Sequence, residues 1–289
     1  MELRTLKMIV LAAGIMLLAA CGQSQKPQAA IGRMAGLYES PAEPAQAMRP
    51  RLKTVTKFEL PVPLKDRPEQ ILTRMGYTVS YNRETKTPNW VAWHLTRQHT
   101  YGRAQRSQEM FTEDESVDAP RATDQDYYNS RYDRGHMCPA GDNKWDENAL
   151  RQSFLFTNIC PQNHNLNRYE WNDIEILCRS WAREYGSVDV VCGPVFSGER
   201  KTIGRNKVRV PDAFFKVVLC RNSGAKAIGF VYQNTGKKQN VYDCIRTVDE
   251  IERLTGIDFF PALDDRTEER VEAEARIKSW NPAYPERYH

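Results

Sequence analysis

The sequence predicts an α+β fold in which helices flank a central, mostly antiparallel sheet. Short apolar segments typical of strands recur along the chain, and Ser223-Gly224 lies between two of them as a hairpin turn. Residues 166–185 instead carry apolar side chains at steps of three and four, which is typical of a helix with one buried face. The 289 residues are enough for one large domain or two small ones.

The first 20 residues have the features of an export signal. Arg4 and Lys7 precede an apolar run at residues 8–20, which is short for a membrane span but suits a signal peptide. The run ends at Ala19-Ala20-Cys21, which resembles the lipobox of bacterial lipoproteins. We therefore expect a lipoprotein signal peptide at residues 1–20 and a lipid on Cys21. The expected location is the bacterial cell envelope, anchored in the outer membrane or facing the periplasm. The alternative is an ordinary signal peptide followed by a chance cysteine.

The next part of the chain predicts a linker, two strands and a loop. Residues 21–57 are rich in Gln, Ala, Pro and Lys without periodicity, which predicts a flexible tether. Residues 76–82 and 89–96 alternate between apolar and polar side chains, which predicts two strands. Residues 97–130 are polar throughout and predict a long surface loop.

The second half predicts further strands and two helices. The predicted strands are residues 154–159, 188–196, 213–221 and 225–232. Gly186 is a plausible stop for the helix at residues 166–185. Thr247 and Glu250 form a capping box that opens another helix, with Gly256 behind it. Residues 266–289 are charged and then interrupted by prolines, which predicts a polar C-terminal tail.

Composition narrows the function only slightly. Lys plus Arg is 41 against 37 acidic residues, a net charge of +4, which suits an anionic partner without requiring one. Six cysteines remain besides Cys21, and an even number in an exported chain permits disulfides. Buried free thiols are the alternative for those in apolar runs. The sequence has no Gly-rich phosphate loop, no Cys-x-x-Cys pair and no His-Glu-x-x-His pattern.

Asp133-Arg134-Gly135-His136 places a candidate base beside a candidate phosphate ligand. Histidine accepts a proton near neutral pH, and arginine binds phosphate oxygens. The asparagines downstream offer the carbonyl oxygens that Mg²⁺ accepts; they are Asn158, Asn163, Asn165, Asn167 and Asn172. Glu175 follows Asn167 by eight residues and Arg179 follows Glu175 by four, offsets that place the three on one helix face. The set predicts metal-assisted hydrolysis of a phosphodiester.

Several stretches then resemble one known family in order and spacing. They are Asp133-Arg134-Gly135-His136, Thr157-Asn158-Ile159-Cys160-Pro161-Gln162, Leu166-Asn167-Arg168-Tyr169-Glu170-Trp171 and Ile174-Glu175. Together they resemble the DNA/RNA non-specific endonuclease family, which includes secreted bacterial nucleases and mitochondrial endonuclease G. The resemblance covers about residues 58–265, and it implies a nuclease domain there with the ββα-metal (His-Me finger) fold.

The resemblance also implies roles for individual residues. His136 matches the general base, Asn167 the direct Mg²⁺ ligand and Glu175 the residue that hydrogen-bonds metal-bound water. The remaining matches are Asn158, which supports the site; Arg134 and Arg179, near the substrate; Asp133, behind the site; and an upstream substrate-binding arginine, either Arg103 or Arg106. Arg168 is a further candidate for substrate binding, with a plain solvated helix charge as its alternative.

Cys138 departs from the family, whose members often carry a small residue such as alanine there. A disulfide between Cys138 and Cys160 that braces the site is one hypothesis. The alternative is a zinc site built from His136, Cys138, Cys160 and His164, which would turn the base into a ligand.

These expectations combine into an exported, Mg²⁺-dependent endonuclease, with Mn²⁺ as a substitute. It would cut DNA and RNA with little sequence preference, because phosphate and metal contacts carry no base information. The family implies products with 5′-phosphate and 3′-hydroxyl ends. The alternatives are a surface lipoprotein that binds nucleic acid without cutting it, and a scaffold; the sequence names no protein partner.

Overall fold

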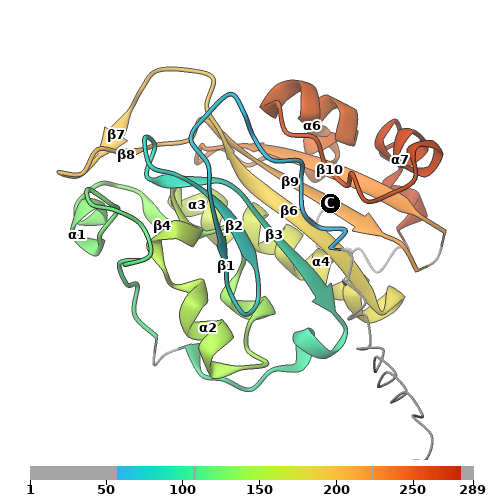
Figure 1. The fold of residues 1–289 in the computed structure, drawn as a ribbon, viewed down its shortest axis with the longest axis horizontal. Coiled ribbons are helices and arrows are strands. Elements are labelled where there is room, and N and C mark those ends of the chain that lie inside the picture. Colours follow the sequence, from blue (N-terminus) through green and yellow to red (C-terminus); the bar gives the residue numbers. More distant parts are fainter. Residues whose placement is uncertain (1–56, 107–108, 223, 281–289) are drawn as a thin grey trace, which may run out of the picture. The chain divides into compact units, whose positions relative to one another are not determined.

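A seven-stranded antiparallel sheet forms the centre of the computed structural model (Figure 1), which describes residues 57–106, 109–222 and 224–280. The strands are ordered β1-β2-β3-β6-β9-β10-β11, and each neighbouring pair is antiparallel. They span Gln70–Thr73 (β1), Thr78–Asn82 (β2), Thr87–Thr96 (β3), Ser187–Val195 (β6), Ala213–Cys220 (β9), Lys226–Gln233 (β10) and Ile245–Arg246 (β11). The predicted α+β class is confirmed.

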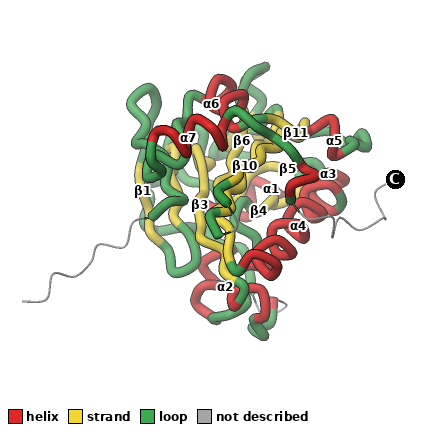
Figure 2. Tube along the Cα trace, turned by 90° about the vertical axis from the view of Figure 1, so that its right-hand side faces the viewer, coloured by secondary structure: helices red, strands yellow, loops and turns green. Residues whose placement is uncertain are grey.

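The central strands are buried on both faces, which explains their continuous apolar runs. Every residue of β9 is buried, and alternate side chains enter different layers. Phe214 and Val218 pack toward α4 (Glu170–Tyr185), whereas Phe215 and Val217 pack toward α6 (Val248–Thr255). Figure 2 shows α4 on one side of the sheet and α6 with α7 (Asp265–Glu272) on the other.

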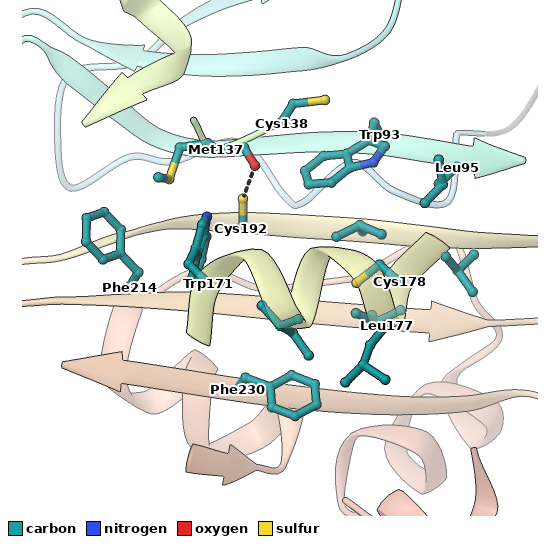
Figure 3. Packing of buried hydrophobic residues seen from close by; sticks show 14 of the residues in the cluster. Trp93, Leu95, Met137, Cys138, Trp171, Leu177, Cys178, Cys192, Phe214 and Phe230 are labelled. Atoms are coloured by element: carbon teal, nitrogen blue, oxygen red, sulfur yellow. Dashed lines mark hydrogen bonds between the residues drawn. The ribbon is translucent and has the colours of Figure 1, made fainter. Parts of the chain in front are cut away.

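Large side chains fill the layer between α4 and the sheet. Trp171, Leu177 and Cys178 of the helix lie against Phe214 and Phe230 of the sheet (Figure 3). The Cys192 thiol of β6 also donates a hydrogen bond to the carbonyl oxygen of Met137, at 3.2 Å. The segment after β4 is thereby attached to the central sheet.

The predicted helix at residues 166–185 is two helices. A short helix, α3 (His164–Arg168), ends at Tyr169, whose φ of −112° and ψ of −89° are not helical, and α4 begins at Glu170. The side chain of Asn163 caps α3 by accepting a hydrogen bond from the backbone N–H of Asn165. Asn167 therefore belongs to a different helix from Glu175, and the expectation that both share a face of one helix was wrong.

A second, separate sheet has two strands. It pairs β4 (Asp133–His136) with β5 (Ile159–Gln162) in antiparallel register. The predicted strand at residues 154–159 is instead mostly a 3-10 turn over Phe156–Asn158, and the strand begins only at Ile159. The remaining described α-helices are α1 (Asp124–Tyr127), α2 (Glu147–Ser153) and α5 (Val241–Cys244), and a small hairpin pairs β7 (Thr202–Ile203) with β8 (Val208–Arg209).

The polar stretch at residues 97–130 is not simply a surface loop. It contains a 3-10 turn at Gln98–Tyr101, and Thr112 forms a bridge with Leu155. Asp114 is buried, and its carboxylate is compensated by a hydrogen bond from the Thr157 hydroxyl at 2.6 Å and by pairing with Arg74. Both partners come from other parts of the chain, so the local pattern could not predict this burial.

Residues 266–280 belong to the folded unit, which corrects the expectation of a tail there. Val271 of α7 and Trp280 are buried. The indole of Trp181 donates a hydrogen bond to the carbonyl oxygen of Trp280 at 3.1 Å, and the two rings lie 4.6 Å apart. Residues 281–289 lie outside the described residues, as do the predicted signal peptide, Cys21 and the tether up to residue 56. None of the described helices combines the length and apolar character needed to cross a membrane.

The six described cysteines are buried free thiols, so the proposed disulfide between Cys138 and Cys160 is not formed. The sulfur of Cys138 instead accepts a hydrogen bond from the side-chain amide of Asn143 at 3.2 Å. The alternative of buried free thiols is the one that the structure supports.

The burial of Trp280 predicts that the end of the described chain contributes to stability. Trp280→Ala should lower the free energy of unfolding by about 3–5 kcal/mol, because it leaves a large cavity beside Trp181. Urea denaturation measures this loss. The exposed neighbour Lys278 supplies the control, since Lys278→Ala should change stability by less than about 0.5 kcal/mol. Equal, small effects of both substitutions would show that residues 266–280 are peripheral after all.

Candidate active site

The side chain of Asn158 fixes the end of β4, where His136 lies. Asn158 is fully buried, and its amide donates hydrogen bonds to the carbonyl oxygens of Cys138 and Ser153, each at 2.8 Å. Its Oδ1 accepts a hydrogen bond from the backbone N–H of Cys138 at 2.9 Å. Asn158 therefore holds the backbone behind the site, and it does not line the cleft described below.

Two further contacts explain why glycine precedes His136 and how the strand is attached to α4. A Cβ atom at Gly135 would lie 2.3 Å from Oε1 and 2.6 Å from Cβ of Gln162, so a side chain does not fit there. The Trp171 indole of α4 donates a hydrogen bond to the carbonyl oxygen of His136 at 3.1 Å.

The imidazole of His136 lies in an aromatic pocket and is kept neutral. Only 7% of the residue is exposed, and the rings of Phe154 and Phe111 lie 4.8 and 5.3 Å away. Burial, assisted by the nearby charge of Arg106, lowers the pKa of His136 to about 3. Nε2 is buried and has no hydrogen-bond partner among the described residues. The ring is thus unprotonated at neutral pH and able to accept a proton.

A polar cleft of about 540 Å³ opens beside His136. It is lined by side chains from β4, α3, α4 and the connecting loops: Arg106, Asp133, His136, Lys144, His164, Asn167, Arg168, Asn172, Glu175 and Arg179, together with Pro139, Ala140 and Gly141. The break at Tyr169 brings Asn167 of α3 and Glu175 of α4 to one cleft although they are on different helices.

Asn167 and Glu175 present oxygen atoms that fit a hard cation. The Asn167 amide donates to Asp133 at 2.9 Å, and among the described residues no donor contacts its carbonyl oxygen. Asp133 also pairs with His164 at 3.0 Å, so its carboxylate lies in the cleft rather than behind it. The Glu175 carboxylate accepts no hydrogen bond from any described residue, and burial raises its pKa to about 7. Amide and carboxylate oxygens of this kind suit Mg²⁺ or Mn²⁺.

The zinc alternative is not supported. Among the described residues, His136, Cys138, Cys160 and His164 do not form a group whose ligand atoms lie close together. Burial also raises the pKa of the Cys138 and Cys160 thiols well above their usual range, whereas zinc binds the thiolate.

The arginines divide into those that reach the cleft and those that do not. Arg179 forms one wall, where it pairs at 2.8 Å with the buried Asp142. Arg106 and Arg168 also line the cleft, but Arg103 does not. Arg134 is also absent from the lining: it pairs with Asp124 at 2.5 Å, and its guanidinium lies over the rings of Phe111 and Tyr127. The structure thus places Arg134 outside the cleft lining, and its role near the substrate stays a prediction.

A fully buried lysine beneath the cleft, Lys216, was not among the predicted site residues. It lies on β9 facing α4, and its Nζ atom is 4.3 Å from the centre of the Trp171 ring. Burial by itself lowers the pKa of Lys216, but the nearby thiols and the carboxylates of Glu175 and Asp142 raise it by more. The net shift of the pKa is upward, so the ammonium stays charged. Its charge in turn lowers the pKa of Glu175 and opposes the effect of burial. A lysine within the apolar run of residues 213–220 was the available signal.

A family model described as DNA/RNA non-specific endonuclease matches residues 55–266. The chain belongs to this family. Its relatives include the mitochondrial nuclease EXOG of Danio rerio, which is 38% identical over 205 residues, 65% of this chain and 60% of the relative. Mitochondrial endonuclease G of Bos taurus is 31% identical over 255 residues, 83% of each chain. The chain thus spans less than two thirds of the EXOG relative's length.

A solved structure agrees with the family assignment. The crystal structure of an EndoG/EndoGI complex aligns with a TM-score of 0.67 and 26% identity, over 76% of this chain and 96% of that one. The predicted family and its ββα-metal fold are confirmed.

The comparisons contradict the predicted location. Relatives from fish, mammals and yeast are named as mitochondrial nucleases, so the expected lipid-anchored place in a bacterial cell envelope was wrong. A short apolar run behind basic residues indicates a targeting segment but does not by itself identify the compartment.

The burial of Lys216 predicts a change in the ionisation of Glu175. Lys216→Met removes the ammonium while keeping an unbranched side chain of similar length. The pKa of Glu175 should therefore rise from about 7 by on the order of one pH unit. Carboxyl ¹³C NMR of glutamate-labelled protein measures it directly. Lys237→Met, on an exposed loop, is the matched control and should leave the titration unchanged. An unchanged pKa in the Lys216 variant would rule out this electrostatic role.

Proposed function

We propose that this chain is a divalent-metal-dependent endonuclease that hydrolyses DNA and RNA with little sequence preference and leaves 5′-phosphate and 3′-hydroxyl ends. The observation that carries the proposal is the neutral imidazole of His136, which shares one cleft with the unpaired oxygens of Asn167 and Glu175. Family membership supports the same reaction.

His136 acts as the general base. At neutral pH its ring is the uncharged imidazole, which has one nitrogen free to accept a proton from a water molecule in the cleft. The hydrogen bond from Trp171 and the clamp by Asn158 keep the strand, and therefore the ring, in place during proton transfer. Its low pKa in the free protein makes it a weak base, so a bound anionic phosphate, which favours the imidazolium, would strengthen it.

Asn167 and Glu175 would hold the divalent cation. Asp133 orients the Asn167 amide by accepting its N–H, which leaves the carbonyl oxygen for the metal. Glu175 is available as a carboxylate above its pKa of about 7 and would hydrogen-bond water around the ion. When bound, Mg²⁺, or Mn²⁺ in its place, supplies positive charge for the phosphate and the leaving 3′-oxygen.

Basic side chains of the cleft bind the substrate backbone. Arg106, Lys144 and Arg168 line the cleft, and no described carboxylate forms a salt bridge with any of them. Their charges are thus available for phosphate oxygens, whereas Arg179 is held by Asp142 and shapes the wall. Side chains that contact only phosphates bind nucleic acid of any sequence. This accounts for the proposed lack of sequence preference.

His136→Ala should lower the rate of plasmid nicking in Mg²⁺ by about 10²–10⁴-fold, because the general base is lost. His99→Ala provides a matched control, since His99 stacks on Trp145 and does not line the cleft. EDTA should abolish nicking by the unmodified protein. Unchanged nicking by the His136 variant, or robust nicking in EDTA, would refute the mechanism. Retained binding of DNA without any nicking by the unmodified protein would favour a non-catalytic binding protein.

The cleft also distinguishes between the two upstream arginines. Arg106→Ala should lower the nicking rate by roughly 10²-fold through lost stabilisation of the transition-state charge. Arg103→Ala, three residues away and outside the lining, should have little effect. Rates measured at one fixed salt concentration give the comparison, because phosphate contacts weaken as salt rises. A larger loss for Arg103 would mean that the loop closes differently on its substrate.

A further inference from the structure

Three carboxylates meet between α6 and α7, on the face of the sheet opposite the cleft. Asp249 and Glu252 come from α6, and Glu272 comes from the end of α7. One oxygen of each lies within 4.8 Å of one oxygen of both others. Among the described residues, no other such group of histidine, cysteine, aspartate and glutamate side chains occurs.

Apolar packing holds these acids together. Val248 and Ile251 of α6 and Val271 of α7 are buried in one cluster against the sheet, which fixes the two helices side by side. Asp249 and Glu252 are three positions apart and therefore project from the same side of α6. The helices approach because of their apolar contacts, and the acids come together despite their like charges.

The carboxyl group of Glu272 lacks the partners that burial normally requires. Only 7% of this residue is exposed, and no donor among the described residues forms a hydrogen bond with its buried Oε1 atom. A buried carboxylate is costly unless a positive charge or several donors compensate it. One carboxylate oxygen of Glu272 lies within 4.8 Å of an oxygen of Asp249 and of an oxygen of Glu252. The buried carboxyl group of Glu272 therefore adjoins those two acids.

The electrostatic surroundings of the group are acidic throughout. Burial and then the neighbouring carboxylates raise the pKa of Glu272 to about 8 and that of Glu252 to about 7. Glu268 and Asp258 add to this effect, and the largest charge effects at both residues come from carboxylates. The backbone N–H of Phe259 donates to Glu252 at 2.8 Å, which is the one compensating contact that lowers its pKa.

We propose that Asp249, Glu252 and Glu272 form a structural site for a hard divalent cation, best matched by Ca²⁺, which ties α7 to α6. Two oxygens bound to one Ca²⁺ at about 2.3–2.6 Å can be at most about 5 Å apart, which agrees with the observed spacing. Ca²⁺ accepts several carboxylates in flexible geometry, whereas Mg²⁺ keeps most of its waters and zinc favours nitrogen and sulfur ligands. The site is separate from the nuclease cleft and does not depend on the proposed function.

Thermal unfolding of the full chain, stripped with EGTA, tests the site. Adding millimolar CaCl₂ should raise the Tm by several degrees, because a cation that binds only the folded state stabilises it. Glu272→Gln should lose this shift, and its Tm without Ca²⁺ should equal or exceed that of the unmodified protein, since repulsion is relieved. Glu269→Gln, on the exposed side of α7, is the matched control and should keep the full shift.

Asn167→Ala separates this site from the active cleft, and it should also keep the full Ca²⁺ shift. Should Glu272→Gln fail to fold, Asp249→Asn provides the same test from α6. The proposal is overturned if Ca²⁺ leaves the Tm of the unmodified protein unchanged. It is equally overturned if Glu272→Gln keeps the shift, or if Asn167→Ala loses it.

Discussion

The hydrogen bond from the Trp171 indole to the carbonyl oxygen of His136 joins the parts on which the active cleft depends. Trp171 is the second residue of α4, its ring packs on Phe214 of the central sheet, and Lys216 lies against its face. One buried side chain thus fixes the positions of the base strand, the helix that carries Glu175 and the sheet beneath. A shift of α4 would move the acid and the base together.

Burial then sets the chemistry of the cleft in two opposite directions. Removing water disfavours the charged form of any group, so it lowers the pKa of His136 and raises that of Glu175. The base is neutral as a result, while the pKa of the acid rises to about 7. Lys216 limits this rise from below, because its charge favours the carboxylate. The buried charge of Lys216 thus acts on the ionisation of Glu175 in the cleft above it.

The two faces of the sheet use charge differently. On the α4 side, carboxylates have cationic neighbours, as Asp142 has Arg179. On the side of α6 and α7, the carboxylates of Asp249, Glu252 and Glu272 instead lie close to one another, and the largest charge effects on Glu272 come from other acids. Apolar packing of Val248, Ile251 and Val271 holds α6 and α7 together although their acids repel. The difference lies in whether the protein itself provides the counter-charge.

The sequence by itself determined the strands β2, β3, β6, β9 and β10 of the central sheet, the capped helix after Thr247 and the family, because these follow from local periodicity and from motifs of adjacent residues. It also selected His136, Asn167 and Glu175, which the structure brings to one cleft. Only the tertiary structure decided that Arg134 turns away toward Asp124, that Arg106 rather than Arg103 reaches the cleft, and that Trp280 is buried. Each of these depends on a partner that is distant in sequence, and periodicity records the burial of a residue but not the identity of its partner.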